Sequence, residues 1–276
     1  MKINFIFLSI FFIAITTKGE ESKYTGSTPA DPVVRSFLGI ALQDSVDFVR
    51  WQLTFQNNNY TLNCNYGIGK PNTNGFINDG KKITLTGLLN KEKNIYNLKN
   101  ENKTLSIVEL NSNLLHILDT RNNMLIGNGG WCYTLNNIKP IITDAVNIVV
   151  TQTIFKDSIE FEGRTPCAVP GVIPQGMQCY KLKWYIVLYA NAQTGNAGTY
   201  KVFGTPYRSQ GGKTGTWKTI IGKGGRIVYR LNDDKENGFL YLLKLDENIL
   251  MFTDAQGNLL VGNEDFSYTM NRVVHY

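Results

Sequence analysis

The sequence predicts an all-β protein made of two tandem small antiparallel β-barrels. Two observations lead to this prediction: a long segment occurs twice, and apolar and polar residues alternate within each copy. The stretch "LLHILDTRNNMLIGNGGWCYTLNN", which begins at Leu114, matches "ILMFTDAQGNLLVGNEDFSYTMNR", which begins at Ile249. The two stretches align without a gap, and a duplicated domain explains such a match.

The repeat extends upstream through both copies. "RWQLTF" pairs with "KWYIVLY" and sets Trp51 against Trp184. "NYTLNC" pairs with "TYKVFG" and sets Tyr60 against Tyr200. We expect these four aromatic side chains to point into the barrel interiors, which small barrels usually fill with side chains.

Alternation with a period of two identifies the strands. In "KLKWYIVLY", Leu182, Trp184 and Ile186 share one face, whereas Lys181 and Lys183 share the other. This pattern is typical of half-buried antiparallel strands, and turn sequences such as "NDGKK", "NAQTGNAG" and "DDKENG" separate them. Closure into a barrel removes the unpaired edges of such a meander.

The chain divides into four predicted parts. Residues 1–19 read as a secretory signal peptide, with Lys2 before the apolar run "FIFLSIFFIAI". The first barrel is predicted over 33–137, a linker over 138–157 and the second barrel over 158–276. The leader predicts an exported protein, periplasmic or extracellular. Because no cysteine follows the leader closely, we expect no lipid anchor. We expect no transmembrane segment in the mature chain.

Charge is uneven along the chain, whose formal net charge is +6. The stretch 163–232 contains ten basic residues and no Asp or Glu. Such a surface attracts anionic partners, for example acidic polysaccharide or lipid head groups. The alternative is a set of solvated strand faces that acidic residues elsewhere neutralise. The predicted anion-binding residues are Lys181, Lys183, Lys201, Arg208, Lys218, Arg226 and Arg230.

The sequence carries no recognisable catalytic motif. It has two histidines; His116 lies on an apolar strand, and His275 is next to the C-terminus. Neither stands in the context of a serine-type triad. "GGKTG" at 211–215 lacks the remaining residues of a phosphate loop and reads as a hairpin turn. We therefore predict a non-enzymatic protein, and no nucleic-acid partner.

The cysteines suggest one disulfide. Cys167 and Cys179 flank the Pro- and Gly-containing loop "CAVPGVIPQGMQC", and export would permit a bridge between them. A competing interpretation is a Cu(I) site formed by Cys167, Met177 and Cys179 in the reduced protein, because thiolate and thioether ligands suit this ion. The alternation of inward and outward residues along the strands predicts that Cys64 is a buried thiol. It places Cys132 on the opposite face of its strand from its two neighbours.

The second copy contains, in order, the motifs "GRTPC", "GTYKV", "GTW", "LYLLKLDENILMFTDAQGN" and "FSYTM". With these motifs it resembles the N-terminal domain of the NlpE-type copper-resistance and envelope-stress lipoproteins. It implies a lipocalin-like barrel and a place in the cell envelope, with copper homeostasis or stress response as the function. The family's close Cys-x-x-Cys pair is replaced here by Cys167 and Cys179, and its lipid-bearing cysteine is missing.

Two other functions stay open on the sequence alone. A lipocalin-like carrier would hold a small apolar ligand between the aromatic side chains of the barrel interiors. A binding or adhesion module would use the basic second copy against an anionic surface. No cofactor is predicted apart from copper in the family interpretation.

Overall fold

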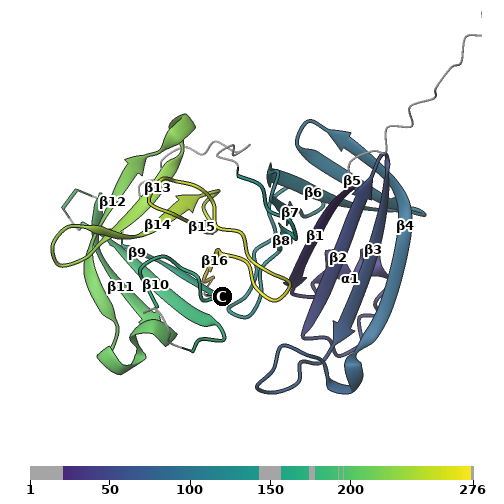
Figure 1. The fold of residues 1–276 in the computed structure, drawn as a ribbon, viewed down its shortest axis with the longest axis horizontal. Coiled ribbons are helices and arrows are strands. Elements are labelled where there is room, and N and C mark those ends of the chain that lie inside the picture. The colour runs from purple at the N-terminus through teal and green to yellow at the C-terminus, as the bar shows by residue number, and fades with distance from the viewer. Residues whose placement is uncertain (1–20, 143–156, 174–177, 192, 195, 275–276) are drawn as a thin grey trace, which may run out of the picture.

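The chain folds into two closed β-barrels that lie side by side (Figure 1). The computed structural model describes residues 21–142, 157–173, 178–191, 193–194 and 196–274. Each barrel has eight antiparallel strands in up-and-down order, and its last strand pairs with its first. The predicted all-β class with two tandem antiparallel barrels is therefore confirmed. The predicted signal peptide, His275 and most of the linker lie outside the described residues.

The strands follow the alternating segments of the sequence. The first barrel contains β1 (Glu21–Thr28), β2 (Phe48–Gln56), β3 (Asn59–Gly67), β4 (Lys81–Glu92), β5 (Ile95–Asn100), β6 (Lys103–Asn111), β7 (Leu114–Ile117) and β8 (Thr134–Asn137). The second contains β9 (Ser158–Thr165), β10 (Leu182–Ala190), β11 (Ala197–Gly204), β12 (Lys213–Ile221), β13 (Ile227–Asn232), β14 (Gly238–Lys244), β15 (Ile249–Thr253) and β16 (Thr269–Arg272). Short 3₁₀ turns lie at Ile77–Asp79, Thr205–Gln210 and Lys223–Gly225.

The first barrel begins at Glu21, so the predicted start at residue 33 is too late. Strand β1 pairs with β2 along its whole length and with β8 at Tyr24 and Thr25, and it thereby closes the barrel. Its sequence "ESKYTGST" is polar and lacks regular alternation, because its buried half includes Thr and Ser. Its counterpart β9 starts at Ser158, where the second barrel was predicted to start.

A short helix, which the sequence pattern did not reveal, packs onto the first core. Helix α1 (Pro32–Leu38) begins after Asp31, whose side chain accepts a hydrogen bond from the backbone N–H of Val34. Proline suits the first turn because that position needs no hydrogen-bonded N–H. Val34, Phe37 and Leu38 are buried in the core of the first barrel. Seven residues are too few for a helical period to stand out in the sequence.

The four predicted interior aromatic residues are all buried in the two barrel cores. Trp51 and Tyr60 belong to the first core, and Trp184 and Tyr200 to the second. The indole N–H of Trp51 donates to Thr28 Oγ1 at 2.8 Å, and that of Trp184 donates to Thr165 Oγ1 at 2.9 Å. A buried indole N–H needs such a partner. The same pair of residues therefore anchors each barrel.

Cys167 and Cys179 form a disulfide, as the sequence predicted. Closing a loop of this length stabilises a fold by about 3 kcal/mol in the chain-entropy model. Val169, inside the loop, is buried in the second core. Cys64 and Cys132 are free and buried. Burial raises the pKa of the Cys64 thiol, so this group stays protonated and unreactive.

Candidate functional site

The two barrels meet through equivalent residues of the two copies. Asn136 Oδ1 accepts a hydrogen bond from the backbone N–H of Gly262 at 2.8 Å, and Asn271 Oδ1 accepts one from Gly127 at 2.8 Å. Asn136 and Asn271 occupy the same place in the repeat, as do Gly127 and Gly262. Such reciprocal contacts are those of a two-fold symmetric dimer. The two barrels are therefore related by an approximate two-fold axis at their interface.

An apolar cluster lies at this interface and draws on both copies. It contains buried side chains of the first barrel, among them Val108 and Leu114, and their counterparts Leu243 and Ile249 of the second. Removal of this apolar surface from water is the main force that holds the barrels together. The relative position of the barrels, and of any site between them, is therefore fixed by the packing.

A chain of side-chain hydrogen bonds crosses the interface. Ser267 Oγ donates to Thr269 Oγ1 at 2.7 Å, and Thr269 Oγ1 donates to Thr134 Oγ1 at 3.0 Å. His116 is next, with Nδ1 2.9 Å from Thr134 Oγ1 and Nε2 2.9 Å from the carbonyl oxygen of Leu125. A carbonyl only accepts, so Nε2 carries the proton and Nδ1 accepts from Thr134. Neutral His116 thus has a structural role, and no substrate surface reaches it, since it is fully buried.

Cys132 lies at the other end of this row of hydrogen bonds, next to Ser267, and it provides a direct test of the interface. Its Sγ lies 2.8 Å from Oγ of Ser267, the equivalent residue of the second copy. We expect Ser267→Cys to produce a disulfide with Cys132, because a small rotation brings the two sulfur atoms together. Peptide mapping without reductant should show the two peptides joined, and Ser267→Ala should leave Cys132 free. Two separately alkylated thiols in the Ser267→Cys variant would contradict the packing described here.

A pocket of about 430 Å³ opens beside the interface and is lined by both barrels. Five cations and two carboxylates line it. The cations are Arg50, Lys70, Arg164, Lys181 and Lys183, and the carboxylates are Asp47 and Asp265. Stacked aromatic rings form one wall: Phe48 stacks on Phe76 and on Trp131, with centroid distances of 4.1 Å and 4.7 Å. The pocket therefore combines excess positive charge with a rigid apolar support.

Three of these cations come together without a carboxylate partner. Arg164 on β9 and Lys183 on β10 are directly opposite each other in the antiparallel register. Like charges at such positions destabilise a sheet. Lys181 is also close: burial lowers its pKa, and the charges of Arg164 and Lys183 lower it further, while Asp265 opposes the shift. Within the described part of the chain, no carboxylate lies within ion-pair distance of any of the three.

Arg164 is held in place by an aromatic ring. Its guanidinium carbon lies 5.5 Å from the ring centroid of Trp131, a cation–π contact between the two barrels. Its Nε is buried and has no hydrogen-bond partner among the described residues. Burial lowers the pKa of the Arg164 guanidinium, and the charge of Glu162 offsets part of this effect. A fixed, partly desolvated guanidinium of this kind is suited to bind an oxyanion.

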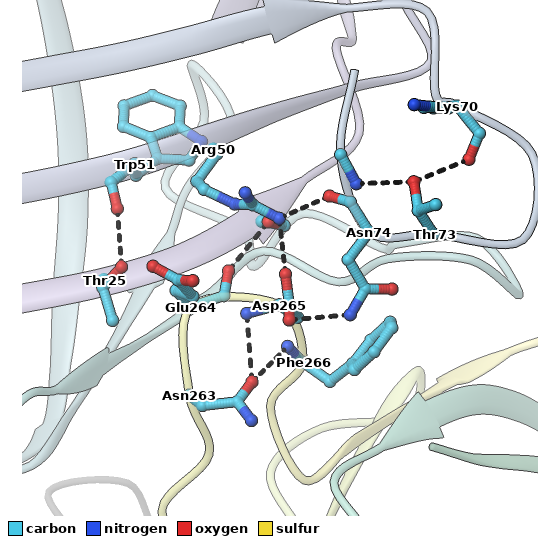
Figure 2. Close-up of polar contacts among 12 residues, drawn as sticks. Thr25, Arg50, Trp51, Lys70, Thr73, Asn74, Asn263, Glu264, Asp265 and Phe266 are labelled. Carbon is cyan, nitrogen blue, oxygen red and sulfur yellow. Dashed lines mark hydrogen bonds and ion pairs between the residues drawn. The ribbon is translucent and has the colours of Figure 1, made fainter. Parts of the chain in front are cut away.

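Arg50 is the pocket cation that pairs with a carboxylate, although its Nε, like that of Arg164, is buried and has no hydrogen-bond partner among the described residues. It forms an ion pair with Asp265, and its Nη2 also donates to the carbonyl oxygen of Asn74 at 2.6 Å (Figure 2). The other carboxylate oxygen of Asp265 accepts from Asn74 Nδ2 at 2.7 Å (Figure 2). Arg50 belongs to the first barrel, whereas Asp265 lies on the 263–266 turn of the second. This carboxylate is therefore bound by the other barrel.

The structure distributes the predicted anion-binding residues over several places. Lys181 and Lys183 lie in the pocket. Lys218 and Arg230 surround Glu236 instead: Lys218 Nζ lies 3.0 Å from a Glu236 oxygen, and Arg230 donates to the Glu236 carbonyl and to Asn232. Glu236 thus neutralises this part of the basic stretch.

The remaining three predicted cations do not meet at one site. Lys201 lies over the ring of Phe203, with Nζ 4.6 Å from its centroid, and Arg208 is exposed on a 3₁₀ turn. Arg226 is buried immediately before β13. None of these three residues lines the pocket, so the prediction that they bind an anion gains no support from this site.

Two of the three residues predicted to bind Cu(I) are not free to do so in this structure. Cys167 and Cys179 are joined to each other, so neither is a thiolate. Met177 lies outside the described residues. Within the described ranges, no group of three or more His, Cys, Asp or Glu side chains is arranged to hold a metal ion.

Sequence reasoning missed Arg50, Arg164 and Asp265. One signal could have located Arg164: "GSTP" at 26–29 matches "GRTP" at 163–166. This match sets Ser27 against Arg164, and it would also have revealed β1.

Comparisons with known proteins give no relative for this chain: no protein-family model, curated protein or solved structure matches it. Within the described residues, no helix has the length and apolar character needed to cross a membrane.

Proposed function

We propose that this protein is an exported, non-catalytic binding module that takes up an anionic ligand in the pocket between its barrels. The observation that supports the proposal is the meeting of Arg164, Lys181 and Lys183 without a carboxylate partner. A bound oxyanion would relieve their mutual repulsion and accept charge-assisted hydrogen bonds. The disulfide is compatible with export, since such bonds persist in oxidising compartments.

The pocket also explains why two barrels are needed. Trp131, from the first barrel, holds the guanidinium of Arg164 from the second. Phe266, from the second barrel, lies under Lys181, with Nζ 5.4 Å from the ring centroid. The Arg164 guanidinium is thus oriented by packing across the interface, whereas the Lys181–Phe266 contact lies within the second barrel. A separated second barrel would lose the support that Trp131 gives to Arg164.

The test is binding of the full chain to a panel of anionic polymers: polyaspartate, polygalacturonate, dextran sulfate and polyphosphate. We expect salt-sensitive binding to at least one of them. Arg164→Gln and Lys183→Gln should each weaken it by about tenfold or more, because a hydrogen bond to a charged group contributes about 1.5–3 kcal/mol. Lys218→Gln is the matched control, since Lys218 pairs with Glu236 away from the pocket.

Two outcomes would contradict the proposal. The first is absence of binding to every polymer at low salt. The second is equal weakening by Lys218→Gln, which would mean that general positive charge, rather than this pocket, attracts the polymer.

The kinship with NlpE-type proteins and a role in copper homeostasis or stress response stay predictions. So does the lipocalin-like carrier. Trp51, Tyr60, Trp184 and Tyr200 are each at most 3% exposed and pack within the barrel cores, which is the arrangement of filled barrels. This packing favours the pocket between the barrels over their interiors as the ligand site.

A further inference from the structure

The pocket consists of two half-sites that the approximate two-fold axis relates. In the first, Arg50 on β2 lies directly opposite Ser27 on β1. In the second, Lys183 on β10 lies directly opposite Arg164 on β9. These four residues occupy two equivalent pairs of positions in the repeat. Each half-site is therefore built on the same two strands of its barrel.

A turn from the opposite barrel faces each half-site, and the two turns have the same hydrogen bonds. In the 263–266 turn, Asn263 Oδ1 accepts from the backbone N–H of Asp265 at 3.0 Å and of Phe266 at 2.9 Å. In the 128–131 turn, Asn128 Oδ1 accepts from Gly130 at 2.8 Å and from Trp131 at 2.9 Å. Gly130 thus stands where Asp265 stands in the other copy.

The first half-site already holds a carboxylate. Asp265 pairs with Arg50 and accepts from the side-chain amide of Asn74 (Figure 2). Its carboxylate is carried by a peptide segment of the other barrel. The first half-site therefore shows, within the same molecule, which chemical group these strands bind.

The second half-site has more positive charge, and among the described residues no carboxylate lies within ion-pair distance of its cations, although the charges of Glu162 and Asp265 act on Arg164 and Lys181. Arg164 stands at the position of Ser27, and Gly130 supplies no side chain. A Cβ atom built on Gly130 would lie 3.7 Å from Arg164 Nη1, so a side chain at this position would begin in contact with the guanidinium. The nearby Glu162 does not fill this place: its Oε2 would lie 2.6 Å from a Cβ on Gly129, so it packs against the turn backbone.

We infer that the second half-site, formed by Arg164, Lys183 and Lys181, binds an aspartate or glutamate side chain of an acidic peptide, in the way that Arg50 binds Asp265. This inference rests on the proposed function and specifies its ligand. The ligand carboxylate accepts from Arg164 and Lys183 and takes the place that a side chain on Gly130 would occupy. A peptide is favoured over a polysaccharide because the carboxylate seen in the equivalent place belongs to a tight peptide turn.

The decisive variant is Gly130→Asp, which would supply the missing carboxylate from within the chain. The fold should accept it, because Asp265 occupies the equivalent turn position and Gly130 has no left-handed backbone conformation. The closest atom to the added Cβ is Asn128 Oδ1 at 3.0 Å, and its counterpart Asn263 makes the same hydrogen bond beside Asp265. The probe is a fluorescein-labelled hexa-aspartate peptide, titrated into the full chain at low salt. We expect wild-type protein to bind it, and Gly130→Asp to weaken binding by about tenfold or more. Gly130→Asn, with the same shape and no charge, is the matched control and should retain binding.

The possible results separate the two proposals. If Gly130→Asp binds the peptide as wild type does while Arg164→Gln does not, the half-site inference is overturned and the pocket proposal survives. If polygalacturonate, dextran sulfate or polyphosphate binds tighter than the peptide, the ligand class is wrong. If neither the peptide nor any polymer binds, both proposals fail.

Discussion

Acidification from about pH 7 to about pH 4 should lower the free energy of unfolding by about 3 kcal/mol through His116 alone. Burial lowers the pKa of His116 from its ordinary value of 6.5 to about 4. In the unfolded chain the imidazole takes up a proton near pH 6.5, whereas in the folded protein it stays neutral until about pH 4. The stability due to neutral His116 is thus complete above pH 6.5 and is lost as the pH falls to 4.

The contacts of His116 give the physical reason. A protonated ring would donate from Nδ1 to Thr134 Oγ1, which already accepts from Thr269 across the interface. The Thr134 hydroxyl would then lose the acceptor for its own proton. Acid should therefore weaken the contact between the barrels as well as the first core.

The repeat supplies a control for this prediction, because Met251 occupies the position equivalent to His116 and is fully buried. Urea unfolding of wild type and His116→Met at both pH values isolates the contribution of the histidine from that of the carboxylates. The variant should lose less stability on acidification. Equal losses in the two proteins would show that His116 is not the responsible group.

Trp184→Ala should destabilise the second barrel by about 3–5 kcal/mol, the usual result of removing a large buried aromatic side chain. The side chain is 3% exposed, packs on Phe252 with ring centroids 5.1 Å apart, and donates to Thr165 Oγ1. The variant loses the apolar contacts and leaves a cavity, and the polar Thr165 loses a partner. Chemical denaturation of the full chain is the measurement.

A second variant separates packing from hydrogen bonding. Thr165→Val keeps the volume and leaves the indole N–H without an acceptor, so it should destabilise by about 1–3 kcal/mol. The equivalent variants of Trp51 and Thr28 should behave alike in the first barrel, because the same hydrogen bond is present there. A Trp184→Ala variant as stable as wild type would contradict the anchoring role.

Alternation and repetition were sufficient to predict the barrels. An inward apolar residue at every second position, as at Leu182, Trp184 and Ile186, leaves few arrangements other than closed antiparallel sheets when polar turns separate the strands. The same reasoning placed Lys183 correctly on the outer face. It could not tell which part of that face meets the other barrel, since period-two patterning describes one strand and contains no information about its partner domain.

The pocket could not be predicted from the sequence for the same reason. Its parts lie on β2, β9 and β10, on the loop 69–74 and on two turns about one repeat apart. Each part is unremarkable within its own segment. Asp265 reads as a turn residue, and Arg50 as a solvated cation. Only when both copies are seen together is it clear that Asp265 pairs with Arg50 and that Gly130 supplies no carboxylate at the equivalent position. A comparison of unmatched positions in the repeat, such as Asp265 with Gly130, would have been the best available guide.

The approximate two-fold axis has a consequence for how such a binding site can change by mutation. In a homodimer, one codon determines both copies of each interface position, so an aspartate that fills one half-site necessarily fills the other. Here the two positions are encoded separately, as Asp265 and Gly130. One chain can therefore keep an internal carboxylate that holds its barrels together in the first half-site. The second half-site can still accept the carboxylate of another molecule.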